Sequence, residues 1–233
     1  MNKIFLLLTL LCLSLSARAH DAEVDGIFYN LDTANKTATV TYKGDKYNSY
    51  SNEYSGDVVI PETVTYNGIT YSVTSLGWAC FTYCSSLTSI TIPNSVTSLG
   101  EGCFVYCSSL PSITIPNSVT SLGGYCFSGC SRLTSIYMLP STPPSTGSNM
   151  FYNAPLETVY VVDEDAKTAY QAQAPWNEYE IVVMPTGIEE VETDKTAPTI
   201  VGCYDLNGKL INGKQRGAVI VRYSDGTTRK VLK

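Results

Sequence analysis

Histidine is nearly absent from this chain, and charge is nearly absent from its centre. The 233 residues include one histidine, His20. Catalytic arrangements of the Ser-His-Asp and Cys-His kinds need an imidazole, and so do most zinc and iron sites, so the sequence argues against these chemistries and predicts no metal site and no cofactor. Between Ser72 and Pro140 the only ionic side chains are Glu101 and Arg132. A surface formed by this segment would therefore carry less charge than an ordinary solvated face.

Long apolar runs are also missing, except at the start of the chain. Residues 1–19 combine a basic start, an apolar stretch and the small residues Ala17 and Ala19, which predicts a signal peptide cut after Ala19. The apolar stretch is shorter than the roughly 20 residues that a membrane-spanning helix needs, and no other segment approaches that length. The mature chain is therefore expected to be exported, without a membrane span.

The mature chain is expected to be acidic. Removal of residues 1–19 takes away Lys3 and Arg18 and no acid, so the formal charge changes from −6 to −8. A chain of this charge has no electrostatic attraction to nucleic acid.

A stretch of 23 residues occurs three times in succession between Ser72 and Pro140. A fixed period of this length, with apolar positions in constant phase, predicts a solenoid in which each repeat is one coil. In the second copy, Ile113-Thr114-Ile115 is expected to be a short strand, and residues 103–107 one helical or 3₁₀ turn. The residues expected to point inward in this copy are Val96, Leu99, Cys103, Phe104, Cys107, Leu110, Ile113 and Ile115.

The segments that flank the repeats have patterns of their own. Residues 20–56 predict a β-hairpin cap, and the Asn67-Gly68 pair predicts a hairpin turn in an insert. Residues 56–61 resemble a degenerate repeat strand, residues 156–162 predict the last strand, and residues 165–173 predict a short helix. The solenoid is thus expected over 57–184. An acidic linker is expected over 185–198, and 199–233 predicts a small β domain with strands at 200–204 and 218–223.

The repeat carries a resemblance. Its pattern I-x-I-P-x-x-V-x-x-(L/I)-G-x-x-(A/C)-F-x-x-C-x-x-L is similar to the BspA-like leucine-rich repeat of bacterial surface proteins, over roughly residues 24–184. The resemblance implies a mainly β fold: a short leucine-rich-repeat solenoid of about four to five coils of 23 residues, with β caps. It also implies an exported protein that binds host or bacterial surface ligands.

The C-terminal segment carries a second resemblance. Residues 204–209, 216–221 and 230–233 are similar to the C-terminal sorting domain of the type IX secretion system. This resemblance implies delivery to the outer surface, with the secretion machinery as a partner.

Six cysteines form three C-x-x-x-C pairs at a 23-residue interval: Cys80 and Cys84, Cys103 and Cys107, Cys126 and Cys130. Three interpretations remain open. Buried free thiols are favoured, because each pair flanks a phenylalanine expected in the core. Equivalent cysteines on adjacent coils would lie about 5 Å apart, within reach of a disulfide. A metal site fits least, because zinc sites prefer ligands on flexible turns.

Two further sets of residues are candidates for function. Ser89, Thr91, Ser112, Thr114, Ser135 and Tyr137 alternate with inward-facing residues, and Trp78, Tyr83, Tyr106 and Tyr125 could serve as stacking platforms. Together they predict an uncharged surface for a protein or glycan, although serine and threonine are also ordinary solvent-facing strand residues. Asp163-Glu164-Asp165 is interpreted as a solvated helix start rather than a calcium or glycosidase site.

The leading hypothesis is a non-catalytic adhesin-like binding protein, secreted or attached to the outer surface. The first alternative is a structural component of the cell envelope that self-associates. An enzyme is a third possibility, but it would need a cleft with paired acids, which the sequence does not indicate.

Overall fold

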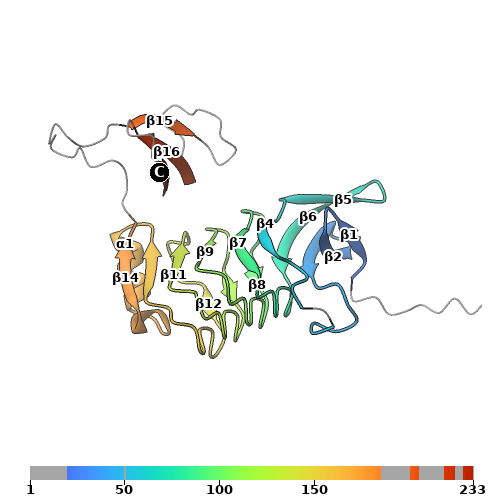
Figure 1. Ribbon diagram of the computed structural model, residues 1–233, viewed down its shortest axis with the longest axis horizontal. Helices are drawn as coiled ribbons and strands as arrows, with labels where there is room; N and C mark the ends of the chain where they lie inside the picture. The colour runs from blue at the N-terminus through green and yellow to red at the C-terminus, as the bar shows by residue number, and fades with distance from the viewer. Residues whose placement is uncertain (1–19, 50, 185–199, 205–217, 224–227, 233) are drawn as a thin grey trace, which may run out of the picture.

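The computed structural model describes residues 20–49, 51–184, 200–204, 218–223 and 228–232. The expected signal peptide and linker lie outside these residues. Residues 20–184 form an elongated stack of coils, with the N-terminal strands at one end and a short helix at the other (Figure 1). The strands in this part are predominantly parallel, as a solenoid of β coils requires.

The N-terminal end is closed by three antiparallel strands. β1 (Ala22–Val24) pairs with β2 (Ile27–Asp32), and β2 pairs with β3 (Thr37–Thr41) in the hairpin that the sequence predicts. β3 then pairs in parallel with β6 (Ile69–Leu76), the first strand of a ladder that runs along the stack. The cap therefore supplies backbone partners to an edge that would otherwise be open.

Two parallel ladders run along the stack. The side ladder continues from β6 through β8 (Ser98–Leu99), β10 (Ser121–Leu122) and β12 (Ser145–Thr146). The outer ladder contains the isoleucine strands that the repeat pattern predicts. Its strands are β4 (Gly56–Val59), β7 (Leu87–Thr91), β9 (Ser112–Ile115), β11 (Ser135–Met138), β13 (Thr158–Val161) and β14 (Glu180–Val183).

Two local expectations in the first part of the stack are confirmed. β4 pairs with β7 so that Val58 lies opposite Ile90, as expected of a degenerate repeat strand. β5 (Thr63–Tyr66) and β6 form the inserted hairpin, with positive φ angles of 49° at Asn67 and 78° at Gly68. An Asn-Gly pair adopts this turn at little steric cost.

The outer ladder is interrupted between β7 and β9. The four-stranded sheet contains β14, β13, β11 and β9, whereas β7 pairs with β4 in a separate sheet. In the next coil Thr134 N–H donates to Pro111 O at 3.1 Å. Pro111 stands at the same position one coil earlier and has no N–H, so it cannot make the corresponding bond to β7.

The third side of each coil, called the turn side here, consists of residues 78–83, 101–106, 124–129 and 148–153. The helical or 3₁₀ turn expected at 103–107 is a run of tight turns with bonds three residues back rather than a continuous helix, because its N–H groups alternate between two kinds of partner. Phe104 N–H donates to Cys126 O of the next coil at 2.8 Å, whereas Cys107 N–H donates to Phe104 O, three residues back, at 3.1 Å. The bonds to the next coil keep the segment from winding into a helix.

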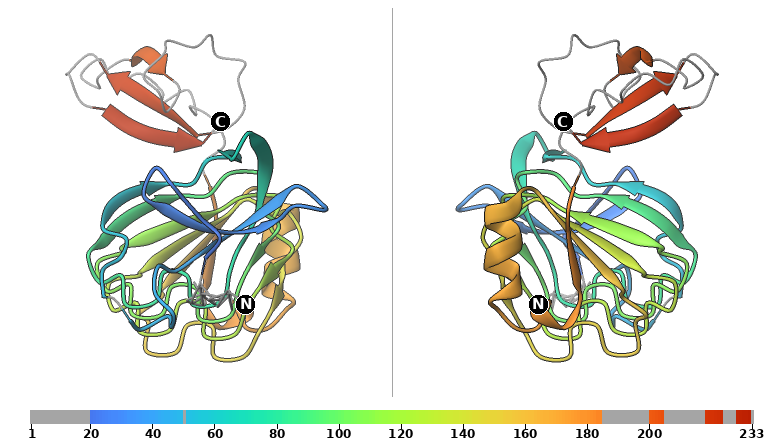
Figure 2. Two further views of the ribbon diagram at one scale, coloured as in Figure 1. Left: turned by 90° about the vertical axis from the view of Figure 1, so that its right-hand side faces the viewer. Right: turned by 90° about the vertical axis from the view of Figure 1, so that its left-hand side faces the viewer.

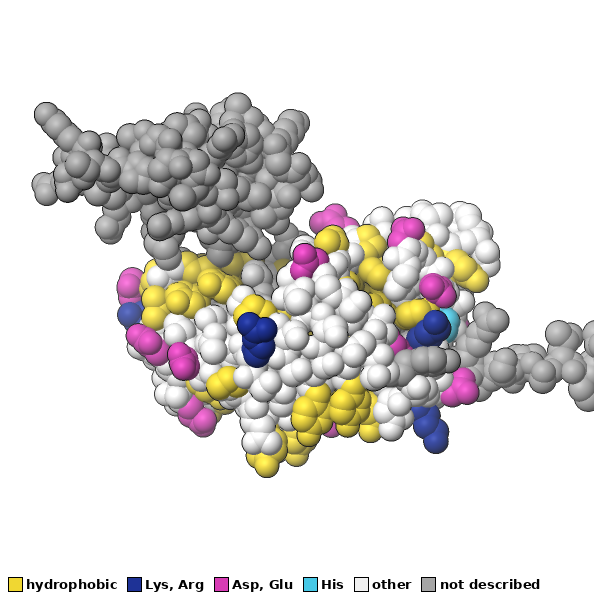
Figure 3. All heavy atoms as spheres, viewed as in Figure 1, with side chains coloured by type: hydrophobic (Ala, Val, Ile, Leu, Met, Phe, Trp, Pro, Cys, Tyr) yellow, Lys and Arg dark blue, Asp and Glu magenta, His cyan; other side chains and the backbone are white. Residues whose placement is uncertain are grey.

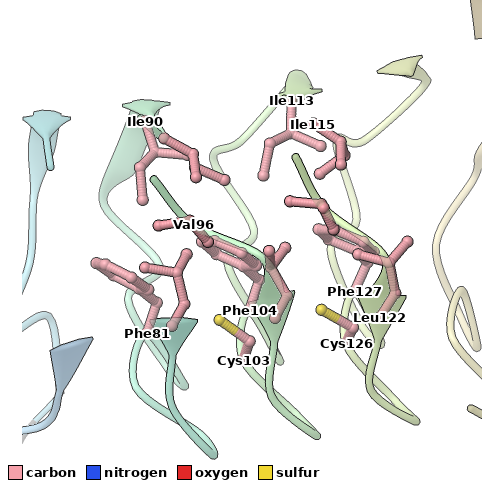
Figure 4. Close-up of a cluster of buried hydrophobic side chains, with 14 of the residues drawn as sticks. Phe81, Ile90, Val96, Cys103, Phe104, Ile113, Ile115, Leu122, Cys126 and Phe127 are labelled. Atoms are coloured by element: carbon pink, nitrogen blue, oxygen red, sulfur yellow. The ribbon is translucent and has the colours of Figure 1, made fainter. Parts of the chain in front are cut away.

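The core lies between these three sides. The rings of Phe81, Phe104, Phe127 and Phe151 form a stack along the solenoid, with centroid separations of 5.1, 5.5 and 5.5 Å. Figure 4 shows the first three rings beneath the inward side chains of the outer ladder, among them Ile90 and Ile113. Each ring covers the next, so the repeats share one continuous hydrophobic core.

The C-terminal end of the stack is closed by the helix α1 (Glu164–Gln171) and a 3₁₀ turn, η1 (Trp176–Glu178). The helix begins one residue before the predicted start, and the Asp163 side chain caps it by accepting a bond from Ala166 N–H at 2.7 Å. Tyr170 and Trp176 are fully buried. Figure 2, which views the stack from its ends, shows the coils superposed and the helix on one side.

The C-terminal segment contains three antiparallel strands. β15 (Ile200–Tyr204) and β16 (Ala218–Tyr223) have the bounds expected from the sequence. β17 (Thr228–Leu232) pairs with β16 as a third strand, beyond the two that the sequence predicts.

A column of glycines brings the coils together on the side ladder. Gly100 N–H donates to Leu76 O and Gly123 N–H donates to Leu99 O, each at 2.8 Å. A Cβ on Gly100 would lie 2.6 Å from Gly77 C, and one on Gly123 would lie 2.5 Å from Glu101 Cα. These neighbours are backbone atoms that cannot move aside, so the fold requires glycine here.

We therefore expect Gly123→Ala to lower the free energy of unfolding by at least about 2 kcal/mol, measured by urea denaturation. Gly124→Ala is the matched control. Its Cβ would meet Ser148 O at 3.2 Å, and we expect a loss below about 1 kcal/mol. Equal losses for the two variants would contradict the requirement for close backbone approach.

Candidate functional site

Six of the candidate residues form one surface, called the outer wall here: Ser89, Thr91, Ser112, Thr114, Ser135 and Tyr137. They lie on β7, β9 and β11. In the ladder of β9 and β11, Ser112 lies opposite Ser135 and Thr114 lies opposite Tyr137. The intervening Ile113 and Ile136 are buried. The predicted alternation therefore gives two rows of side chains that face solvent.

The hydroxyl groups of the outer wall differ in their partners. Ser89 Oγ donates to Asp57 Oδ1 at 2.7 Å, and Thr88 Oγ1 donates to the same oxygen at 2.9 Å. These two bonds, that from Ser89 foremost, hold the pKa of Asp57 below its usual value. Within the described part of the chain, the hydroxyls of the wall residues Thr91, Ser112, Thr114 and Ser135 bond to no protein atom. These hydroxyls are available to water or to a ligand.

The wall becomes aromatic toward its C-terminal end. Tyr137 lies opposite Tyr160 of β13, and the two rings stack with centroids 4.8 Å apart and planes inclined by 10°. Burial, followed by the proximity of Tyr160, raises the pKa of Tyr137. Tyr160 was not among the sequence candidates. The alternating pattern of residues 158–161 could have identified it, because it continues the row of Thr91, Thr114 and Tyr137 by one coil.

The other aromatic candidates lie on the turn side. The rings of Tyr83 and Tyr106 stack at 5.2 Å, and these side chains are 40% and 47% exposed. Trp78 and Tyr125 are exposed on the same side of the stack. The core separates the turn side from the outer wall, as Figure 4 shows by the positions of Phe104 and Ile113. The structure therefore divides the sequence candidates between two surfaces.

The turn side has a strained backbone at both ends of each turn. Two residues per coil have positive φ angles between 53° and 71°. They are Ala79, Gly102, Tyr125 and Asn149 in one row, and Tyr83, Tyr106, Gly129 and Asn153 in the other. Glycine adopts this left-handed conformation freely and asparagine tolerates it, whereas other residues incur about 1–2 kcal/mol each. Three of the eight positions are tyrosines.

Charged side chains are sparse over the middle of the stack. The face shown in Figure 3 is mainly white there, with acidic groups gathered toward its ends and hydrophobic side chains along its lower edge. This agrees with the sequence, which places only Glu101 and Arg132 between Ser72 and Pro140.

The six cysteines are buried and free, as the favoured interpretation expects. They form two columns that line the core: Cys80, Cys103 and Cys126, and Cys84, Cys107 and Cys130. Cys80 Sγ and Cys103 Sγ are 3.3 Å apart, and Cys107 Sγ donates to Phe81 O at 3.1 Å. Burial raises the pKa of Cys84 to about 12 and that of Cys103 well above its usual value. The described residues contain no cluster of potential metal ligands.

The parallel ladders, the stacked phenylalanines and the 23-residue period define a leucine-rich-repeat solenoid. Residues 62–172 match the family model described as a BspA type leucine-rich repeat region, in six copies. This part of the chain is therefore similar to the BspA-type leucine-rich repeat.

The chain is also similar to solved structures of leucine-rich repeat proteins. A leucine-rich repeat protein from Bacteroides ovatus is 32% identical with a TM-score of 0.53, over 71% of this chain and 42% of that one. One from Bacteroides capillosus is 29% identical with a TM-score of 0.48, over 61% and 98%. A leucine-rich cell surface protein from Faecalibacterium prausnitzii is 28% identical with a TM-score of 0.47, over 61% and 36%. The chain thus spans less than half the length of the first of these, and no protein with curated annotation matches it.

Because all six thiols are buried, a charged aromatic disulfide reagent should not react with them in the native mature protein. We expect all six to react after unfolding in urea, measured by absorbance in a Cys203→Ser background. Fewer than six reactive thiols in the unfolded, unreduced protein would show that adjacent coils are joined by disulfides.

Proposed function

We propose that this protein is an exported, non-catalytic, adhesin-like binding protein that recognises a protein or glycan through the solvent-facing rows of its repeats. The observation that carries the proposal is the outer wall. It presents aligned hydroxyls without intramolecular partners, followed by the stacked rings of Tyr137 and Tyr160. Hydroxyls and aromatic rings on a preformed sheet offer directional hydrogen bonds and apolar contact area at a low cost in conformational entropy.

A surface location is supported by the BspA-type repeats, because the family resemblance implies one. The expected signal peptide and the sorting-like C-terminal segment point in the same direction, and the type IX secretion machinery would be the partner of that segment. In the part of the chain that the structure describes, no helix has the length and apolar character that crossing a bilayer requires.

A non-catalytic role is supported by the composition of the wall. Its candidate residues carry hydroxyl or phenol groups but no imidazole or carboxylate, and Asp57 at its edge already accepts two hydrogen bonds. The Asp163-Glu164-Asp165 run begins α1, where Asp163 is engaged as the helix cap.

The wall can be tested by replacing Thr91→Ala, Thr114→Ala and Tyr137→Thr together. We expect affinity for the best ligand to fall at least about tenfold, because truncation of the few residues that dominate a binding surface costs about 2 kcal/mol or more. The ligand would first be selected with the mature chain on an array of glycans and immobilised extracellular-matrix proteins.

The matched control is Thr97→Ala with Thr120→Ala. These exposed threonines lie in the same part of the stack and donate to Thr74 O and Thr97 O near the side ladder, away from the wall. We expect them to leave binding unchanged. Equal binding by the wall variant and the control would show that the wall is not the site. Light scattering that rises with concentration, without binding to the array, would instead favour self-association in the envelope.

A further inference from the structure

The tyrosines at left-handed positions of the turn side are not required by the fold. In the row of Tyr83 and Tyr106, the next coil has Gly129, and in the other row Gly102 stands one coil before Tyr125. The same turn therefore forms with glycine at either end. A bulky residue at positive φ persists where something other than local stability favours it.

The side chains at these positions do not fill the core. The Tyr106 ring covers the surface of the next coil, because a Cβ on Gly129 would lie 2.6 Å from Tyr106 Cε1. Tyr83 stacks on Tyr106 at 5.2 Å, and Tyr152, 59% exposed, lies in the last of these turns beside Asn153, which holds the position of Gly129 there. Gly129 thus makes room for the ring of Tyr106. Together with Trp78 and Tyr125, these residues form a surface that we call the aromatic ridge.

The large exposed hydrophobic side chains of the ridge are all of one chemical kind, aromatic. The exposed large hydrophobic side chains of the described repeats and cap are Val59, Ile69, Trp78, Tyr83, Tyr106, Tyr125 and Tyr152, and every one on the turn side is aromatic. Protein-binding surfaces combine aromatic residues with methionine and arginine. The ridge lacks exposed aliphatic side chains, and the surrounding repeats carry almost no charge.

Polar groups accompany the rings. Asn149 Nδ2 donates to the Tyr125 hydroxyl at 2.9 Å. In the described part of the chain, the hydroxyls of Tyr83, Tyr106 and Tyr152 have no protein partner. A sugar ring presents C–H groups that pack on an aromatic surface and hydroxyls that need hydrogen-bond partners, without charge. This combination matches the ridge better than an acidic glycan or a charged peptide does.

Trp78 lies on the ridge, and neighbouring aromatic rings fix its side chain in position. Its indole makes edge contacts with the rings of Tyr47 at 4.9 Å and Tyr42 at 6.2 Å, yet it remains 51% exposed. A large ring that is fixed by neighbours and still half exposed loses little conformational freedom when a ligand covers it.

We propose that the aromatic ridge binds a neutral glycan chain, which contacts the half-exposed indole of Trp78 and the exposed edges and hydroxyls of Tyr83 and Tyr106. The inference rests on the proposed binding function but assigns it a second site, on another side of the solenoid from the outer wall, and a ligand class.

The two tryptophans allow a direct test on the mature chain. Trp176 is fully buried, so acrylamide quenching of fluorescence reports on Trp78. Short oligosaccharides of glucose, mannose and galactose are the neutral probes, and a sulfated glycosaminoglycan is the acidic comparison. We expect at least one neutral probe to reduce quenching in a saturable way, and Trp78→Phe to remove the quenchable signal, which verifies that Trp78 is the reporter. Protection by none of the neutral probes, or by the sulfated probe alone, overturns the proposal.

The double variant Tyr83→Asn with Tyr106→Asn separates binding from stability. It should lose about a hundredfold in affinity for the neutral probe, because removing each ring costs about tenfold. Its thermal midpoint should not fall, since asparagine tolerates the left-handed backbone better than tyrosine does. Tyr83→Phe with Tyr106→Phe keeps both rings and should lose less than about tenfold in affinity.

The variant of the outer wall distinguishes the two sites. If neutral glycan binding falls with the wall variant and not with the Asn double variant, the ridge proposal fails and the proposed function stands. If the Asn double variant is destabilised and still binds, the tyrosines are structural and the ridge is not the site. Binding of an immobilised protein through the ridge, with no neutral glycan bound, also overturns the proposal.

Discussion

The backbone of each coil depends on its neighbours for hydrogen bonds. On the side ladder, N–H groups such as that of Gly123 donate to the preceding coil, whereas on the turn side those such as that of Phe104 donate to the following one. A coil removed from the stack would leave these groups without protein partners on both sides. Since a buried N–H or C=O without a partner is costly, the repeats are stable only as a stack with closed ends. This accounts for the antiparallel cap at one end and for α1 with Trp176 at the other.

The same constraint separates residues that the fold fixes from residues that it leaves free. Backbones that approach closely require glycine at positions such as Gly100, and stacked rings require phenylalanine at positions such as Phe104. Outward positions have no such requirement, because the ladder bonds come from the main chain. Serine, threonine and tyrosine can therefore alternate along the outer wall without cost to the stack. The outward residues are thus free to differ from coil to coil, and a binding surface can be encoded in them.

The sequence was sufficient to predict whatever depends on the repeat period and on local turn chemistry. Apolar residues recur at the same positions of each repeat, and this recurrence identified the residues that point inward. The Asn67-Gly68 pair identified the inserted hairpin. The turn at 103–107 was expected to be one helical or 3₁₀ turn. Bonds to the next coil set its φ angles instead, and a single repeat does not contain that information.

The candidate site was only partly predictable for a related reason. Alternation along one strand predicted that Thr91 and Thr114 face outward. It could not show that Tyr83 and Tyr106 lie on a different side, because their positions depend on how the chain turns between strands. The break at Pro111 illustrates the same point. Proline has no backbone N–H. The ladder bond that is lost, and the break between β7 and β9 that follows, become evident only when the two coils are placed side by side.

The two surfaces have different physical characters, and this bears on how a short solenoid could bind. The outer wall is a sheet face whose side chains alternate and whose hydroxyls are evenly spaced by the ladder, at about 4.8 Å per strand. The turn side is a row of corners where rings lie against the neighbouring coil, as Tyr106 does over Gly129. Because both repeat along the same axis, an elongated ligand could contact several coils on either side. Contacts that are individually weak would then add along its length, which favours a chain-like ligand over a small molecule that one coil could hold.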